Sequence, residues 1–283
     1  MANFILSAFA DEVSSDFTAQ LDYLKSKNIR FIEPRNIDGT GVSALTVSEA
    51  LHAKKKMDAY GIGVSSVGSP IGKIQLSDDF AAHIRLFEHT MDIAEIFGTK
   101  NIRMFSFFYP AGTDVRSHRA AVLARLEILA ELAEKRGMVL CHENEKAIYG
   151  EDPAECLDIM EHFGGRIKSV LDMGNFAFCQ KDPLAGYNAL APYIEYIHIK
   201  DAFFDTRIVP AGKGEGKVAE ILSAVNKAID RDVFLTLEPH LTVFGGLEKL
   251  SNLNDIKVEN AYETPVAAFD AAYDALTGIL ASL

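Results

Sequence analysis

Hydrophobic and polar positions along the chain follow two alternating patterns. Short runs rich in β-branched and aromatic residues alternate with longer segments in which apolar residues recur at helical spacing. The short runs predict eight strands, over Phe4–Ala8, Arg30–Glu33, Gly63–Val67, Asn101–Ser106, Met138–Glu143, Ile167–Asp172, Tyr193–Ile199 and Val233–Glu238. The longer segments predict eight helices, over Asp16–Lys27, Val47–Tyr60, Asp79–Phe97, Val115–Arg136, Pro153–Phe163, Pro183–Ala191, Val218–Ile229 and Pro265–Leu280.

Several predicted helices begin with residues that favour a helix start. Thr46 and Glu49 have the spacing of a capping box, in which each side chain binds the other's backbone N–H. Three more helices place an oxygen acceptor directly before a proline, whose missing N–H would be unsatisfied in the first turn anyway. These pairs are Asp152-Pro153, Asp182-Pro183 and Thr264-Pro265.

Strict alternation of strand and helix predicts an α/β fold with a parallel sheet and right-handed crossovers. Eight such units in 283 residues predict a single-domain (β/α)8 TIM barrel over residues 1–283. An open doubly wound sheet is the alternative, but the stretch after the first strand, "SAFADEVSSD", lacks the glycines of a dinucleotide-binding turn. The segment of about 239–263 exceeds the usual loop length, and we expect it to cover the barrel mouth or to make a subunit contact.

Composition narrows the range of partners. The chain is 48% hydrophobic and has a net charge of -12. The negative charge disfavours nonspecific binding to nucleic acid and so favours a small-molecule partner. Its three cysteines show no paired spacing for a disulfide framework or a structural zinc site. No apolar run approaches a membrane span, and the start "MANFILSAFADE" lacks a basic, cleavable signal, so we expect a cytoplasmic protein. Homo-oligomer formation stays open.

Ionisable residues lie at the carboxyl ends of four consecutive predicted strands, as the last residue or the last but one: Glu143, Asp172, His198 and Glu238. In a (β/α)8 barrel these strand ends meet at the mouth, where catalytic groups lie. Converging buried carboxylates are costly unless a cation compensates their charge. The set therefore predicts one divalent metal ion, and mostly oxygen donors with one nitrogen suit Mn²⁺, Mg²⁺ or Co²⁺, with Zn²⁺ also compatible.

Further polar residues are expected near the same mouth. Lys200 has the strand parity of His198, and we interpret it as a substrate clamp rather than a solvated lysine. Glu33, Arg35 and Lys73 follow the second and third strands and are expected at the rim, where they could bind polar substrate. His240, at the root of the long segment, is expected to point inward.

Two other signals have structural interpretations. Alternation turns His142 away from the side taken by Glu143, towards the helix layer, so no ligand role is expected for it. The run "GKGEG" at Gly212–Gly216 resembles a phosphate cradle, but a flexible turn before the next helix is the favoured interpretation.

The motifs "HENE", "LDMGN", "IHIKD" and "LEP", in this order at the last four strand ends, resemble those of sugar phosphate isomerase/epimerase members of the xylose-isomerase-like TIM-barrel superfamily. The resemblance extends to "SAFADE" and "IRMFSF" and covers nearly the whole chain. It implies that Glu143, Asp172, His198 and Glu238 hold one metal ion and that the two glutamates are acid/base catalysts.

The resemblance leads us to expect a divalent-metal-dependent sugar or sugar phosphate isomerase or epimerase. A proton would move next to a carbonyl through a metal-stabilised enediolate. Asn175, Tyr149 and Phe204 stand where ketose 3-epimerases carry histidine, glutamate and arginine, which disfavours a simple ketose 3-epimerase. The alternatives are a metal-dependent keto-sugar or inosose dehydratase or lyase, a glycosidase and a non-catalytic sugar-binding barrel.

Overall fold

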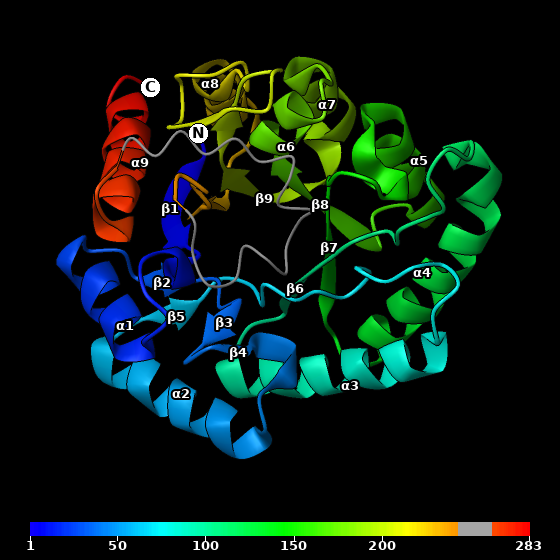
Figure 1. Cartoon of the computed structure of the whole chain (residues 1–283), viewed down its shortest axis with the longest axis horizontal. Helices are drawn as coiled ribbons and strands as arrows, with labels where there is room; N and C mark the ends of the chain where they lie inside the picture. Colours follow the sequence, from blue (N-terminus) through cyan, green and yellow to red (C-terminus); the bar gives the residue numbers. More distant parts are fainter. Residues whose placement is uncertain (243–261) are drawn as a thin grey trace.

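The inner wall of the protein is a ring of parallel strands, seen end-on in Figure 1. The structure is a computed structural model that describes residues 1–242 and 262–283. Six strands form one sheet in the order β1-β12-β9-β8-β7-β6. Their bounds are Asn3–Ala8 (β1), Asn101–Met104 (β6), Val139–Glu143 (β7), Ile167–Asp172 (β8), Ile194–Ile199 (β9) and Asp232–Leu237 (β12). Phe31–Ile32 (β2) and Gly63–Val64 (β5) pair with each other, also in parallel.

A few backbone hydrogen bonds close the ring between these two groups of strands, including a parallel bridge between Val67 and Ile102. The N–H of Glu33 donates to the carbonyl of Ala8 at 3.0 Å, and the N–H of Val67 donates to that of Asn101 at 2.9 Å. The predicted (β/α)8 TIM barrel is therefore confirmed. β2 is shorter than predicted, and Pro34, two residues after its end, has no N–H to extend a strand ladder.

Helices surround the ring on the outside (Figure 1). The eight predicted helices are present as Phe17–Ser26 (α1), Val47–Tyr60 (α2), Phe80–Phe97 (α3), Arg119–Lys135 (α4), Pro153–Phe163 (α5), Pro183–Leu190 (α7), Val218–Ala228 (α8) and Pro265–Leu280 (α9). Each turns an apolar face to the sheet. α8, for example, buries Val218, Ile221, Leu222 and Val225, the spacing of one helix face. None of the described helices is long and apolar enough to cross a membrane.

The predicted helix caps are present. Thr46 and Glu49 form the capping box, and the side chains of Asp152, Asp182 and Thr264 each accept an N–H of the helix that follows. One start was wrong: Asp114 caps a 3-10 turn over Val115–His118, and the α-helix itself begins at Arg119.

Short elements absent from the sequence predictions lie mostly in the loops that follow the strands. They are the helix Met173–Phe178 (α6), the hairpin of Asn36–Ile37 (β3) and Thr40–Gly41 (β4), the hairpin of Asp201–Ala202 (β10) and Ile208–Val209 (β11), and 3-10 turns at Ala10–Glu12, Val42–Ala44, Tyr149–Glu151 and Ala191–Tyr193. The long segment predicted to cover the mouth lies mostly outside the described residues, so its role stays a prediction.

The barrel interior is filled by side chains in layers. Cys141, Val170 and Tyr196 form a buried cluster separate from the main core between sheet and helices. Because side chains alternate along a strand, the residues two positions further on face the same interior one layer higher. Those residues are Glu143, Asp172 and His198, at the carboxyl ends of their strands. Strand alternation thus places these polar residues one layer above Cys141, Val170 and Tyr196.

Candidate metal centre

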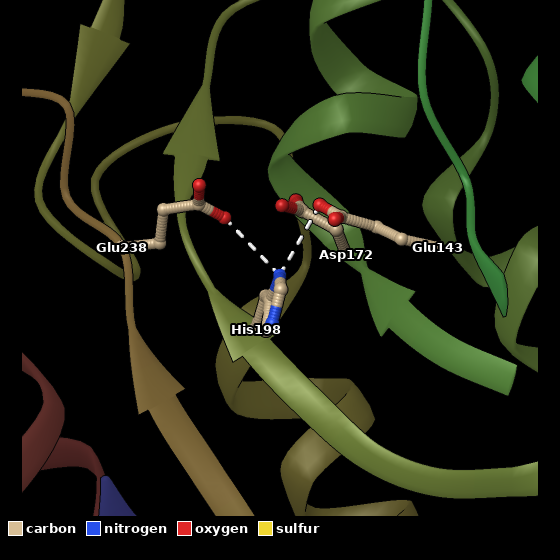
Figure 2. Close-up of side chains that lie close together, drawn as sticks. All are labelled: Glu143, Asp172, His198 and Glu238. Carbon is tan, nitrogen blue, oxygen red and sulfur yellow. Dashed lines mark hydrogen bonds and ion pairs between the residues drawn. The ribbon is translucent and has the colours of Figure 1, made fainter. Parts of the chain in front are cut away.

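Four side chains converge at the mouth of the barrel (Figure 2). Glu143 and Asp172 end β7 and β8, His198 is the last residue but one of β9, and Glu238 directly follows β12. Each offers one potential ligand atom, and these atoms all lie within 4.8 Å of one another. Nδ1 of His198 is 3.1 Å from Oε1 of Glu143 and 3.1 Å from Oε2 of Glu238. The four candidate ligands of the sequence therefore come together in space.

The local sequence after β8 fixes the orientation of Asp172. Its Oδ1 caps α6 by accepting the N–H of Asn175 at 2.7 Å. The side chain of Asn144 binds both the backbone N–H and the carbonyl of Asp172, at 2.9 and 2.8 Å. Gly174 is required here because a Cβ would come within 2.7 Å of the Lys200 backbone. Oδ2 is left to face the other candidate ligands, 3.1 Å from Nζ of Lys200.

Three buried carboxylate oxygens in this cluster accept no hydrogen bond from the described part of the chain. They are Oε2 of Glu143, Oδ2 of Asp172 and Oε2 of Glu238. Each lies instead at ion-pair distance from a basic group: Nη1 of Arg103 at 3.3 Å, Nζ of Lys200 at 3.1 Å and Nδ1 of His198 at 3.1 Å, respectively. One oxygen from each of three carboxylates, together with one imidazole nitrogen, is a donor set that fits a divalent cation.

The pKa values show how strongly the groups of the cluster interact. Burial raises the pKa of Asp172 to about 7, although Lys200 opposes the shift. Burial alone would also raise the pKa of Glu143, but His198 and Arg103 lower it to about 2. The pKa of His198 is well above its usual value, because Glu143 and Glu33 outweigh the effect of burial. In the absence of a cation, the cluster thus depends on protonated neighbours for its charge balance.

Arg35, expected to bind substrate at the rim, is buried and orients Glu238 instead. Its guanidinium binds both oxygens of Asp11, at 2.9 and 3.0 Å, and donates to Oε1 of Glu238 at 2.9 Å. It also lies over the ring of Phe9, 4.5 Å from the centroid. These contacts restrict the guanidinium to one position.

A second acidic group lies on the other side of Glu238. Potential ligand atoms of Glu12, Glu238 and His240 also lie within 4.8 Å of one another. Arg35 already supplies a positive charge there, since it donates to Glu12 at 3.3 Å as well as to Glu238. Burial raises the pKa of Glu12 to about 8. The arrangement needs no second cation.

A pocket opens above the four converging side chains. It is lined by Lys73, Arg103, Glu143, Glu145, Lys146, Asn175, Phe178, Lys200, Ala202, Ile208, Glu238 and His240. Lys200 is only 6% exposed, so it is not a solvated lysine. Lys73 lies 4.3 Å from the centroid of the Phe105 ring and forms an ion pair with Glu145 at 3.0 Å. Three of the five predicted substrate-binding residues, Lys73, Lys200 and His240, therefore line this pocket.

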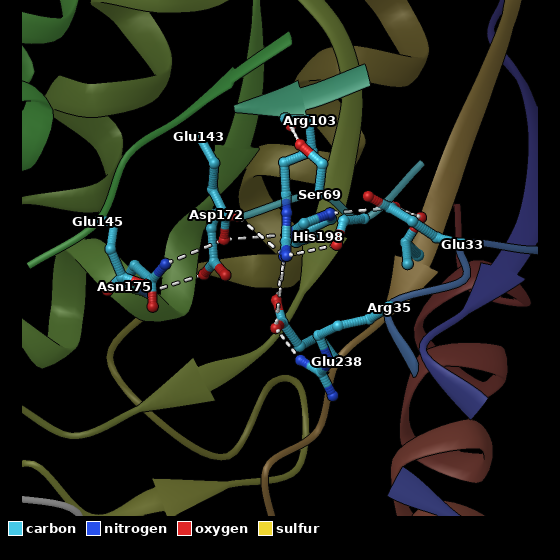
Figure 3. A network of polar contacts seen from close by, with 12 residues as sticks. Glu33, Arg35, Ser69, Arg103, Glu143, Glu145, Asp172, Asn175, His198 and Glu238 are labelled. Carbon is cyan, nitrogen blue, oxygen red and sulfur yellow. Dashed lines mark hydrogen bonds and ion pairs between the residues drawn. The ribbon is translucent and has the colours of Figure 1, made fainter. Parts of the chain in front are cut away.

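Glu33 is not at the rim, and that expectation was wrong. Its side chain is fully buried beneath the cluster, with Oε2 3.2 Å from Nε2 of His198 (Figure 3). The cause is the position of Glu33 directly after β2, where its side chain points into the barrel rather than over the mouth.

Arg103 is the main site residue missed in the sequence. Its Nη1 lies 3.3 Å from Oε2 of Glu143 and 4.0 Å from Oε1 of Glu238, and the guanidinium lies near the rings of Phe9 and Phe105. The available signal was a single arginine inside the apolar run of β6. It pairs across the sheet with Cys141, which faces the interior.

The two structural interpretations agree with the contacts. His142 is buried on the opposite side of β7, 2.9 Å from the hydroxyl of Ser106, and burial lowers its pKa to about 4. The amides of Gly212, Gly214 and Gly216 all donate to the carboxylate of Asp201. This glycine run is therefore an ordered turn whose donors are already used, and not a phosphate cradle.

The chain belongs to the xylose isomerase-like TIM barrel family, whose model matches residues 21–252. No curated protein matches the sequence significantly. Among solved structures, L-ribulose 3-epimerase is 20% identical with a TM-score of 0.74 over 100% of this chain and 95% of that one. The IOLI protein with a bound zinc atom is 15% identical with a TM-score of 0.76 over 98% of both chains. The probable 3-DHS dehydratase AsbF from Bacillus anthracis is 18% identical with a TM-score of 0.67 over 84% and 92%.

Proposed function

We propose that this protein is a divalent-metal-dependent isomerase or epimerase of a sugar or sugar phosphate. The observation that carries the proposal is the buried cluster of three carboxylates and one imidazole, in which one oxygen of each carboxylate accepts no hydrogen bond from the described residues. Glu143, Asp172, His198 and Glu238 would hold the ion. When bound, the ion would polarise a substrate carbonyl and favour loss of the neighbouring proton. The structural likeness to an epimerase and to a zinc-binding barrel supports the proposal.

Two carboxylates are available to move the proton. Glu143 and Glu238 approach Nδ1 of His198 from opposite sides in Figure 2. A carbon bound between them would have one base on each face, so removal by one glutamate and return by the other would invert it. Arg35 keeps Glu238 in place by its bond to Oε1, and Arg103 does the same for Glu143.

The remaining polar residues of the pocket would hold the rest of the substrate. Lys200, Lys73 and His240 line the pocket beside the cluster and could bind distal hydroxyls or a phosphate. Lys200 already carries an ion pair to Asp172, so it could also stabilise negative charge that develops on a substrate oxygen.

Elemental analysis of the purified protein, followed by exchange in D₂O, tests the proposal. We expect a stoichiometric divalent metal, and incorporation of solvent deuterium at one carbon when ketoses, inososes and their phosphates are screened. Glu238→Gln should abolish exchange without unfolding the protein, whereas Glu220→Gln on the exposed side of α8 should leave it unchanged. Exchange that survives chelation of the metal, or survives in Glu238→Gln, would refute the assignment.

A dehydratase or lyase is the second candidate, favoured by the likeness to a probable dehydratase. It would share the first proton removal and then expel a substituent from the next carbon. Product mass separates the two, because dehydration removes the mass of one water and epimerisation leaves the mass unchanged.

A further inference from the structure

We propose that Glu33 is a positioning residue that holds the ring of His198 with Nδ1 towards the candidate metal ligands. The inference rests on the proposed metal-dependent function, because His198 would supply the nitrogen donor. It also gives Glu33 a different role from that of a substrate-binding residue at the rim.

The carboxylate of Glu33 is surrounded by hydrogen-bond donors (Figure 3). Its Oε2 is 3.2 Å from Nε2 of His198 and accepts a hydrogen bond from the hydroxyl of Thr236 at 2.9 Å. Its Oε1 accepts a hydrogen bond from the hydroxyl of Tyr196 at 2.8 Å. The side chain of Glu33 is 0% exposed. The carboxylate is therefore held in one orientation from both of its oxygens.

This orientation decides which nitrogen of His198 faces the cluster with a free lone pair. A neutral imidazole carries one N–H, and an acceptor beside one nitrogen places the proton there. Carboxylates lie beside both nitrogens, Glu33 at Nε2 and, 3.1 Å away, Glu143 and Glu238 at Nδ1. A cation held by Glu143 and Glu238 would take the place of the proton on Nδ1, and Glu33 would keep the remaining proton on Nε2. Packing against Phe9, with centroids 5.1 Å apart, limits rotation of the ring.

A carboxylate in this place is not explained by packing alone. Burying it costs free energy that an apolar side chain of similar size would avoid. Its two hydroxyl partners are neutral, and within the described residues the group at ion-pair distance is His198. Glu33 does join β2 to β9 and β12 across the barrel, so a purely structural role is the competing explanation. The two roles predict different measurements.

The test is Glu33→Gln, with metal affinity measured by titration against a competing chelator. The glutamine amide can donate to Nε2, which would shift the ring proton to Nδ1 and block it. We expect the dissociation constant for Co²⁺ to rise about 10- to 100-fold, with a changed Co²⁺ absorption spectrum. Asp201→Asn is the matched control, since Asp201 is also 0% exposed and binds the glycine turn. It should keep the affinity of the wild type.

An unchanged affinity in Glu33→Gln, with only a lower melting temperature, would overturn the proposal in favour of the structural role. If Glu33→Gln fails to fold, the variant Tyr196→Phe tests the proposal instead. It removes one hydrogen-bond donor to Glu33 and should weaken Co²⁺ binding about threefold. Unchanged Co²⁺ binding in this variant would overturn the proposal. The wild type is measured first. A wild type that binds no Co²⁺ would refute the proposed function and, with it, the inference about Glu33. If the wild type binds Co²⁺ and the affinity of Glu33→Gln is unchanged, only the inference about Glu33 is refuted.

Discussion

Replacing Asp201 with asparagine should destabilise the protein substantially while leaving its fold intact. Oδ1 of Asp201 accepts the N–H groups of Ala202 and Gly216, at 2.9 and 2.8 Å. Oδ2 accepts those of Gly212 and Gly214, at 2.8 and 3.0 Å. Asparagine keeps one oxygen and turns an NH₂ group towards the other two donors. Two charge-assisted hydrogen bonds are lost.

Each of these bonds is worth about 1.5–3 kcal/mol. The loss is partly offset because asparagine avoids the cost of burying a charge, which raises the pKa of Asp201 above its usual value. We therefore expect the free energy of unfolding to fall by about 3 kcal/mol, out of a typical total of about 5–15 kcal/mol.

Urea unfolding of the metal-free protein, followed by circular dichroism, measures the change. Asp230→Asn is the control, because the Asp230 side chain is 95% exposed and should change stability by less than about 0.5 kcal/mol. If Asp201→Asn also lowered the free energy of unfolding by less than about 0.5 kcal/mol, the glycine amides would have equally good hydrogen-bond partners elsewhere. The role assigned to Asp201 would then be refuted.

Two further predictions concern charge in the barrel mouth. A divalent ion at a concentration 100 times its dissociation constant should stabilise the protein by about 2.7 kcal/mol. The measurement is a higher melting temperature that a chelator reverses, and no shift with any divalent ion would contradict the metal site. Glu12 is buried with its pKa raised from 4.5 to about 8, so its contribution to stability is present at low pH and lost as pH rises towards 8. Between pH 5.5 and 7.5, wild type should lose about 2 kcal/mol more than Glu12→Gln in urea unfolding, and equal losses would refute the shift.

The sequence was informative wherever the structure depends on neighbours along the chain. The positions of Glu143, Asp172 and His198 at strand ends predicted that they meet at the barrel mouth, because the carboxyl ends of all barrel strands lie at one face. Helix starts were predicted from capping residues such as Thr46 and Glu49, which lie only three residues apart in the sequence. The short helix α6 was missed because its cap, Asp172, had been interpreted only as a strand end.

Tertiary structure decided the partners of the buried charges. Arg35 and Glu238 are 203 residues apart in the sequence, and Glu33 and His198 are 165 apart. No local sequence pattern identifies the two partners of such a pair, because other residues of the same charge near the rim have the same local pattern. The sequence by itself determined the barrel and the four residues at its strand ends. Only closure of the ring decided that Glu33 lies under His198 and Arg35 against Glu238, because contacts across the barrel depend on which side chains point inward and at what depth.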